Sequence, residues 1–318
     1  MGTLCGLFGK SKQAYYKHLR PRFSDAEVRR EVLSLVAGYR QEMPRIGGLK
    51  LYHLVRAVLG DALGMGRDKF LLLMQQERLL ILPRKSWHTT CSNHIFFKYP
   101  NLAKGLVISH VNQLWVSDIT YLHTARDGFC YLHLVTDAFS RMIIGYAVSA
   151  TLEAKYTQQA LEMAIAQAGG GNLCGTIHHS DRGVQYCCGA YVQALHDHHI
   201  RISMTEDGTP TDNALAERTN GIIKNEFIEP LPAMQDLREA AERVAHAVHT
   251  YNTLRPHRSL GMQTPAMVYY GHDSQWNTFE NGRNNNTFRN GCDGNRFGNG
   301  GGNNTFDNGC GTNTFGDG

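Results

Sequence analysis

The chain has 318 residues and a formal net charge of +4, which is long enough for a buried core and two or three structural units. Its 8 cysteines show no C-x-x-C spacing and no disulfide-framework density, which argues against a zinc finger and a secreted protein. The chain also lacks a signal-peptide pattern and any apolar run near the roughly 18 residues of a membrane span. We therefore predict a cytoplasmic protein with reduced thiols and no membrane partner.

The positive charge is concentrated in the first third of the chain. Residues 1–104 contain 18 Lys and Arg against 7 Asp and Glu, whereas residues 105–272 contain 11 against 16. A basic front joined to an acidic middle indicates an arm that binds a polyanion, attached to a body whose carboxylates can hold metal. A solvated basic surface on helices is the alternative interpretation.

Residues 1–83 are predicted to form a helical unit. Apolar residues follow helical spacing from residue 25, again from residue 51, and again over residues 67–82. The expected buried positions are Val28, Val32, Val36, Leu51, Leu54, Val55, Val58, Phe70, Leu71, Met74 and Leu79 or Leu80. Three short helices with exposed Arg and Lys are typical of a helix-turn-helix that binds DNA, although a small bundle that docks protein has the same periodicity. Residues 84–110 have no clear period and are predicted to be a basic linker.

Residues 111–272 change to a pattern of strands. Three β-rich runs form a predicted meander, followed by a helix at 152–168, a strand at 175–181, a helix near 190–196, a strand at 200–204 and a helix at 212–228. The apolar stripe of a final helix contains Met234, Leu237, Ala241, Val244, Val248 and Tyr251. This order predicts an α/β fold with a mixed sheet of the ribonuclease-H type, flanked by helices.

Residues 273–318 form a repetitive tail. Asn-Thr-Phe or Asn-Arg-Phe recurs every nine residues, and Gly and Asn make up 23 of the 46 residues. Such a segment buries too little apolar surface to fold alone, and it lacks the regular Asp of calcium-binding nonapeptide repeats. We predict a disordered tail and assign it no catalytic role.

Three acidic residues carry the chemistry that we expect from this fold. Asp118 lies in the first strand run, Asp181 ends the fourth, and Glu217 lies about one turn into the helix that begins near Asp212. A helix crossing the sheet could place the three carboxylates together, where their mutual repulsion favours cations. Oxygen ligands suit Mg²⁺ or Mn²⁺, and two such ions assist phosphoryl transfer. Taken singly, each acid has a simpler interpretation as a cap or a salt-bridge partner.

Five motifs carry a family resemblance. They are WVSDITYL, TDAFSRMIIGY, HHSDRGVQY, DNALAERTNGIIKNE and YNTLRPHRSLGMQTPAMVY. They resemble the catalytic core of the retroviral-integrase superfamily and, more closely, the DDE transposases of bacterial insertion sequences that are encoded in two overlapping frames. The resemblance covers most of residues 1–270. It implies a metal-dependent enzyme that cleaves one strand at the ends of the element and joins the freed 3′-hydroxyl to another phosphodiester.

The resemblance also assigns partners. It implies two divalent ions, Mg²⁺ or Mn²⁺, double-stranded DNA from the element ends and the target, and a homo-oligomer on DNA at the bacterial nucleoid. The front of the chain resembles only the second-frame product, so an upstream-frame product is expected to be fused or required. The tail at 273–318 lies outside the family pattern.

The resemblance assigns roles residue by residue. Asp118, Asp181 and Glu217 match the metal-binding triad, with the usual 35-residue gap between the last two. Lys224 matches the basic residue seven positions after the glutamate, and 3.6 residues per turn place it on the face of Glu217, where it could touch a DNA end. A solvated helix lysine is the alternative.

Further residues near the triad have less specific assignments. Arg182 and Arg218 are expected to contact DNA, and His179 and Asn213 to support the metal ligands from behind. The alternatives are that His179 simply fills a strand position and that Asp212 and Asn213 cap the helix. A further set resembles the family's terminal motif and is expected to anchor the last helix to the core: Tyr251, Asn252, Arg255, Pro256 and His257.

Two other functions compete with a transposase. One is a catalytically silent DNA-binding or regulatory relic of such an element, which the presence of all three acids argues against. The other is a ribonuclease-H-like or resolvase-like nuclease without strand transfer, which the DNALAER and RPH motifs disfavour.

Overall fold

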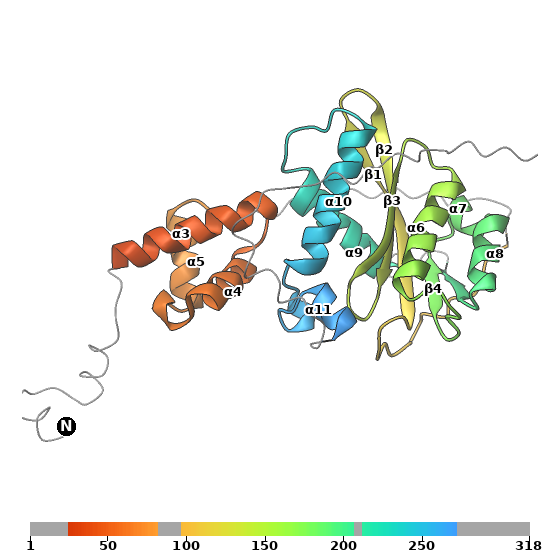
Figure 1. Cartoon of the computed structure of the whole chain (residues 1–318), viewed down its shortest axis with the longest axis horizontal. Coiled ribbons are helices and arrows are strands. Elements are labelled where there is room, and N and C mark those ends of the chain that lie inside the picture. Colours follow the sequence, from red (N-terminus) through yellow and green to blue (C-terminus); the bar gives the residue numbers. More distant parts are fainter. Residues whose placement is uncertain (1–24, 82–96, 207–211, 272–318) are drawn as a thin grey trace, which may run out of the picture. The chain divides into compact units, whose positions relative to one another are not determined.

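The computed structural model describes residues 25–81, 97–206 and 212–271 (Figure 1). The repeat tail predicted at 273–318 lies outside these residues, as does most of the predicted basic linker. None of the described helices is long and apolar enough to cross a membrane.

The helical unit contains the three predicted helices. They are α3 (Asp25–Glu42), α4 (Gly48–Leu59) and α5 (Arg67–Gln76), with a 3₁₀ turn η1 (Gly60–Leu63) between the last two. Six of the expected apolar positions are buried: Val32, Val36, Leu51, Val55, Phe70 and Met74. Val58 also lies in α4, as its spacing predicted, but this residue is 55% exposed.

The third helix ends earlier than the periodicity predicted. Arg78 adopts a left-handed φ of 57°, and the Leu79 N–H returns to the carbonyl of Met74 at 2.7 Å. This arrangement satisfies carbonyl groups that the end of a helix leaves open. The helix therefore stops at Gln76, and Leu79 and Leu80 follow it in irregular structure.

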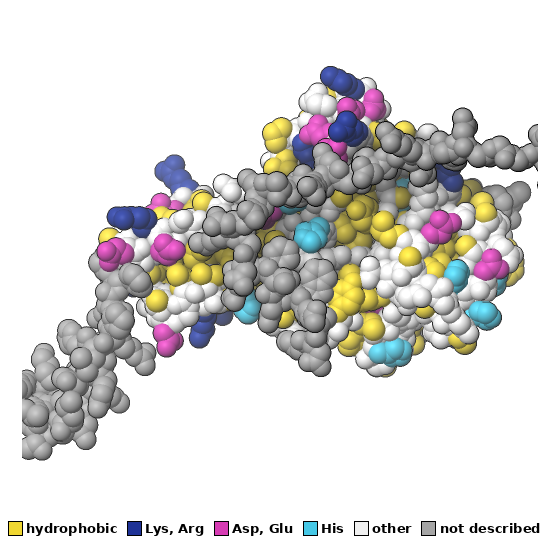
Figure 2. Space-filling model, in the orientation of Figure 1, with side chains coloured by type: hydrophobic (Ala, Val, Ile, Leu, Met, Phe, Trp, Pro, Cys, Tyr) yellow, Lys and Arg dark blue, Asp and Glu magenta, His cyan; other side chains and the backbone are white. Residues whose placement is uncertain are grey.

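Most of the excess positive charge predicted for the first third of the chain lies outside the described part of this unit. Residues 25–81 contain 9 Lys and Arg and all 7 of the acidic residues of the first third, whereas residues 1–24 and 82–96 contain 7 basic residues and no acidic ones. Basic and acidic side chains are interspersed on the surface in Figure 2, and two of the arginines form ion pairs, Arg29 with Glu77 and Arg67 with Asp68. A polyanion-binding arm is therefore a prediction that concerns mainly the residues outside the described ranges.

The second half of the described chain is built on a five-stranded sheet. The strands are β1 (Leu114–Thr124), β2 (Gly128–Asp137), β3 (Ile143–Ser149), β4 (Ile177–Ser180) and β5 (Arg201–Met204). Their order is β3-β2-β1-β4-β5, with antiparallel pairing among the first three and parallel pairing of β1 with β4 and of β4 with β5. This is the predicted meander followed by parallel strands, and the ribonuclease-H-like mixed sheet is confirmed.

Helices cover the sheet on two sides. Figure 1 shows α6 (Ala154–Gln167) and α8 (Gly189–Asp197) on one side and α9 (Ala214–Ile222) and α10 (Leu237–Thr253) on the other. The short α7 (Val184–Cys187) packs with α6 and α8. Because side chains alternate along a strand, Trp115 of β1 packs with the α6 side, while Leu122 packs with the α10 side.

The end of the core differs in detail from the prediction. The helix expected over 212–228 is α9 followed by a π-helical segment, η2 (Ile223–Ile228). The buried face of α10 contains Ala240 rather than the expected Ala241, because Ala240 precedes Val244 by four residues. Met234 is buried, but it lies before the helix and bridges to Thr124 of β1. A 3₁₀ turn, η3 (Arg258–Leu260), and α11 (Pro265–Tyr270) complete the fold.

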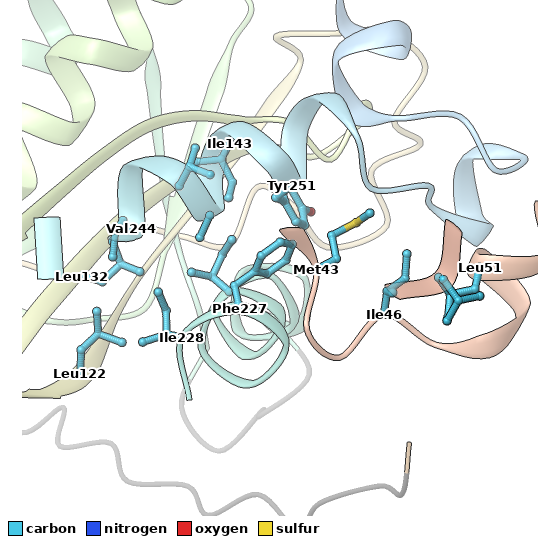
Figure 3. Packing of buried hydrophobic residues seen from close by; sticks show 14 of the residues in the cluster. Met43, Ile46, Leu51, Leu122, Leu132, Ile143, Phe227, Ile228, Val244 and Tyr251 are labelled. Carbon is cyan, nitrogen blue, oxygen red and sulfur yellow. The ribbon is translucent and has the colours of Figure 1, made fainter. Parts of the chain in front are cut away.

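One hydrophobic cluster extends from the helical unit into the half of the chain that carries the sheet. Figure 3 shows Met43, Ile46 and Leu51 in the same cluster as Phe227 and Tyr251. Residues 97–110 have no regular secondary structure, as expected of a linker, but they are not free of the core. Their apolar side chains, Leu102, Leu106 and Ile108 among them, pack against a cluster that includes Leu114 and Ile177.

Candidate functional site

Asp118 and Asp181 come from neighbouring parallel strands. Ser117 of β1 is paired with Ser180 of β4, and each serine is followed directly by one of the two aspartates. The strand register therefore places both acids at the same level of the sheet, as the sequence predicted for Asp181 at the end of the fourth strand.

Asp118 lies in an environment that disfavours its charge. Burial raises the pKa of Asp118 to about 7, and the charges of Asp181 and, less strongly, Glu217 add to this effect. Two hydrogen bonds oppose it, from the Ile119 N–H to Oδ1 and from Asn220 Nδ2 to Oδ2, each at 2.9 Å. The three acids thus share one electrostatic environment.

Asp181 is partly buried and is held by the turn that follows it. The Gly183 N–H donates to Asp181 Oδ1 at 2.9 Å. The next helical turn brings in Tyr186, which is 2% exposed. The pKa of its phenol is raised well above its ordinary value, first by burial and then by the charges of Asp181 and Asp118. Tyr186 therefore contributes a neutral, apolar surface beneath the two aspartates.

Glu217 occupies the first turn of α9, and its side chain is exposed. Two asparagines on the same face attach this helix to β1: Asn213 Nδ2 donates to the Ser117 carbonyl at 3.0 Å, and Asn220 Nδ2 donates to Asp118. Positions 213, 217 and 220 follow helical spacing, so the face that carries Glu217 is turned toward Asp118.

The three acids are neighbours but not a closed set of ligands. Among the described residues, no group of three or more His, Cys, Asp or Glu is close enough to hold a metal ion. The structure places Asp118 on β1, Asp181 directly after β4 and Glu217 on α9, the elements that the sequence predicted.

His179 connects three parts of the fold through a defined chain of hydrogen bonds. Its Nε2 donates to the Asp212 carbonyl at 3.1 Å, and its Nδ1 accepts from Ser203 Oγ at 2.8 Å. Ser203 Oγ in turn accepts the Leu102 N–H at 2.8 Å. Burial lowers the pKa of His179, which keeps the ring neutral as this arrangement requires. His179 therefore fixes the start of α9 relative to β4 and β5.

Asn213 does not cap α9 with its side chain, so that alternative was wrong. Its amide is used for the bond to Ser117 described above, because the helix begins directly over β1. Asp212 is also engaged elsewhere: its Oδ2 accepts from Asn101 Nδ2 and from the Glu206 N–H, each at 3.0 Å.

The expected DNA-contacting residues lie on, or next to, the elements that carry the acids. Arg182 follows Asp181, Arg218 is exposed on α9, and Lys224 is partly buried in η2. The Glu229 N–H bonds to the Lys224 carbonyl at 2.9 Å, which is the i to i−5 pattern of a π-helix. The regular α-helix therefore ends at Ile222, and Lys224 is the second residue of the π-helical segment.

Sequence reasoning missed Asn220 and a buried polar group behind the aspartates. Asn220 lies three residues after Glu217, so helical periodicity could have identified it. His178 Nε2 contacts Ser117 Oγ at 2.7 Å and the Tyr191 hydroxyl at 2.9 Å, and burial lowers the pKa of His178 to about 3. No sequence signal distinguishes this neutral histidine from a ligand.

The terminal motif anchors α10 as expected. Asn252 Oδ1 accepts the Ile143 N–H at 3.0 Å and its Nδ2 donates to the Ile143 carbonyl at 2.9 Å, so the side chain pairs with β3 like a further strand residue. The Tyr251 hydroxyl donates to the Arg141 carbonyl at 3.0 Å.

The raised pKa of Asp118 predicts a pH-dependent stability change. In the folded state Asp118 keeps its proton up to about pH 7, whereas 3.8 is its ordinary value. Its contribution to folding is therefore full below pH 3.8 and is lost as the pH rises toward 7. Asp118→Asn should stabilise the metal-free protein at pH 8 by about 2 kcal/mol, half of the full linkage because the side chain is partly exposed.

The measurement is urea unfolding of both proteins in chelator at pH 5 and pH 8. At pH 5 the advantage of Asp118→Asn should fall to roughly 1 kcal/mol, because the folded protein then keeps the proton on Asp118 whereas the unfolded chain has already lost most of it. A difference that does not change between the two pH values would contradict a raised pKa for Asp118.

Comparison with known proteins gives a consistent assignment. Two family profiles, each described as an integrase core domain, match residues 109–210 and 198–265. An uncharacterized 31 kDa protein of insertion element IS600 from Shigella sonnei is 30% identical over 269 residues, which cover 83% of this chain and 96% of that protein. The transposase for insertion sequence element IS629 from Shigella sonnei is 33% identical over 58% of this chain and 61% of its own length.

Two other matches are more limited. The putative transposase for IS986/IS6110 from Mycobacterium tuberculosis is 36% identical over 157 residues, and the chain spans 56% of its length. The catalytic core domain of HTLV-2 integrase in complex with magnesium is 22% identical, with a TM-score of 0.39 over 50% of this chain and 97% of that one. The strand order and the sequence relatives identify the fold.

Proposed function

This chain belongs to the integrase-core family of insertion-sequence DDE transposases, enzymes that cleave and join DNA strands, and from that membership we propose that Asp118, Asp181 and Glu217 form its catalytic site. One observation carries the proposal: β1, β4 and α9 deliver these acids into one electrostatic environment, in which burial and neighbouring charge raise the pKa of Asp118 to about 7. Ionising such a buried acid costs free energy when the acid is alone, and a bound cation offsets this cost.

The residues present fit divalent metal ions. The donors are carboxylate oxygens, two of them partly buried, and such hard ligands prefer Mg²⁺ or Mn²⁺. Two bound ions would supply activation of the attacking oxygen and stabilisation of the leaving oxygen. Asp118 and Asp181 would hold them from the sheet and Glu217 from α9, while Asn213 and His179 keep α9 in place.

The DNA substrate is a double-stranded element end and then a target duplex. Arg182, Arg218 and Lys224 are proposed to contact its phosphates, because all three lie close in sequence to the acids and can position a polyanion without reading its sequence. Since two ends must be joined in one event, we propose a homo-oligomer on DNA at the nucleoid, with the upstream-frame product fused or present.

A strand-cleavage assay tests this function. The full chain, alone and fused to its upstream frame, is incubated with labelled terminal DNA of its element in Mg²⁺, in Mn²⁺ or in chelator. We expect nicking at the end and joining of the 3′-hydroxyl only with metal. Nicking without joining would favour a nuclease, and binding without either reaction in both forms would favour a silent relic.

A further inference from the structure

Arg141 lies in the turn between β2 and β3, and its backbone is held from two directions. Its N–H donates to the Asp137 carbonyl at 2.9 Å, and its own carbonyl accepts the Tyr251 hydroxyl at 3.0 Å. The residue has a left-handed φ of 65°, a conformation that glycine adopts at less cost than arginine. The turn by itself would favour glycine at this position, so the arginine side chain needs a separate explanation.

The guanidinium of Arg141 has no carboxylate partner. Its side chain is partly buried, and burial is the main cause that lowers the pKa of Arg141. Within the described ranges of the chain, no salt bridge involves it. The carboxylate of Asp137 acts on Arg141 only weakly, and its oxygens already accept hydrogen bonds from Ser140 and from the Asn112 N–H. A partly buried charge without a partner costs free energy, which a bound anion would offset.

Arg218 of α9 adds a second cation near Arg141. Tyr251, which binds the Arg141 carbonyl, also has a side-chain hydrogen bond with Thr219, the residue after Arg218. The charge of Arg218 lowers the pKa of Arg141 further, so the two guanidinium groups are close enough to repel each other. Arg218 is exposed, and it too has no ion pair with any described residue. Two neighbouring like charges without a carboxylate favour a bound anion.

The nearest carboxylate on the other side of Arg141 is already in use. After burial, the charges of Arg255, Lys50 and Arg141 lower the pKa of His257 to about 3, so these three cations face one area. Glu226 accepts two hydrogen bonds from Arg255, at 2.9 and 2.8 Å, and lies 3.7 Å from Lys50. Its charge is thus shared between two other cations, which leaves Arg141 without neutralisation.

We propose that Arg141 and Arg218 together bind a backbone phosphate of the DNA duplex on which the three acids act. The inference rests on the proposed function, and it adds the β2–β3 turn to the DNA-binding surface. Guanidinium groups bind phosphate oxygens with paired, charge-assisted hydrogen bonds. Because Arg218 directly follows Glu217 in α9, the pair lies beside the helix that carries the third acid. A phosphate contact of this kind positions a duplex without reading its sequence.

The salt dependence of DNA binding tests this contact. Binding of the full chain to labelled terminal DNA of its element is measured in chelator over a series of KCl concentrations, for the wild type and for Arg141→Gly. Glycine suits the left-handed turn, so the variant should fold. We expect the slope of log K against log [KCl] to become shallower by about 0.9, and binding at about 0.1 M KCl to weaken roughly three- to tenfold, because one phosphate contact is lost.

Arg201→Ala is the matched control. Arg201 is exposed on β5, at the opposite edge of the sheet from β3, and its loss changes the net charge by the same amount. This variant should keep the wild-type slope, because a phosphate contact and not the total charge sets the slope. An equal change of slope in Arg201→Ala would show a general charge effect and overturn the assignment to Arg141.

Phosphate ethylation gives an independent readout. Ethylation of a contacted phosphate blocks binding, so the wild type should show interference at discrete phosphates of the terminal DNA. Arg141→Gly and Arg218→Ala should each lose interference at the same phosphate and keep it elsewhere, because both arginines bind one phosphate. Loss of interference at different phosphates in the two variants would contradict the pair.

The outcomes separate the inference from its premise. Absence of DNA binding by the wild type would overturn the proposed substrate and the inference with it. An unchanged slope and an unchanged interference pattern in folded Arg141→Gly would overturn the phosphate contact and leave the proposed function intact. If circular dichroism shows that Arg141→Gly does not fold, Arg141→Asn takes its place under the same criteria, since asparagine also tolerates a left-handed φ.

Discussion

Asp181→Asn is expected to reduce metal-dependent strand nicking and joining by at least about 1,000-fold. The amide has nearly the shape of the carboxylate and can still accept the Gly183 N–H, so the turn after β4 should be kept. It removes the negative charge that divalent ions require, and metal ions stabilise transition-state charge by several kcal/mol, at 1.36 kcal/mol per tenfold in rate. The measurement is the initial rate of each reaction on labelled end DNA in saturating Mg²⁺.

The matched control is Asp197→Asn. Asp197 ends α8 and is exposed, and its Oδ1 accepts from Gln193 on the same helix. This substitution should change both rates less than about twofold, because surface changes away from a site have small effects. Wild-type rates in Asp181→Asn would remove Asp181 from the metal site.

Gly145→Ala is expected to have the largest effect on stability, a loss of at least about 3 kcal/mol in the free energy of unfolding. Gly145 is a buried residue of β3 that lies directly against α6. A Cβ at this position would lie 2.0 Å from the Ala160 carbonyl oxygen and 2.9 Å from the Ala164 nitrogen, both backbone atoms. Since backbone cannot move aside as a flexible side chain can, α6 would have to shift away from the sheet.

Gly38→Ala provides the opposite case. Gly38 is exposed within α3, and an added Cβ would meet nothing within 4 Å. Alanine favours a helix interior over glycine, so this variant should be more stable by about 0.5–1 kcal/mol. Urea unfolding of the three proteins gives the comparison, and equal stabilities for Gly145→Ala and the wild type would show that α6 does not pack this closely on β3.

The elements and the order of the acids could be predicted because each rests on a local pattern. Alternation of side chains placed Asp118 in a strand, and helical spacing placed Glu217 one turn into a helix. The same patterns cannot show that Asn220 reaches Asp118 or that Asn213 bonds to Ser117 rather than capping α9, because these contacts depend on how the helix crosses the sheet.

The departures from regular secondary structure could not be predicted from the sequence either. Within the π segment η2, Glu226 bonds to Arg255, which lies 29 residues later, and no local spacing indicates this contact. Likewise, the way α10 packs against its neighbours decides that Ala240, and not Ala241, is buried. The sequence correctly gives the excess of basic residues in the first third of the chain. It does not show that this excess belongs mainly to residues outside the described structure, 1–24 and 82–96.

The central claim is that Asp118, Asp181 and Glu217 bind divalent metal together. Calorimetric titration of Mn²⁺ into the full chain at pH 8 tests this directly, with Glu217→Gln compared against Glu162→Gln on the exposed side of α6. We predict that Glu162→Gln binds Mn²⁺ as the wild type does and that Glu217→Gln binds at least about tenfold more weakly, since one charged ligand is lost. Unchanged Mn²⁺ affinity in Glu217→Gln would contradict a shared site.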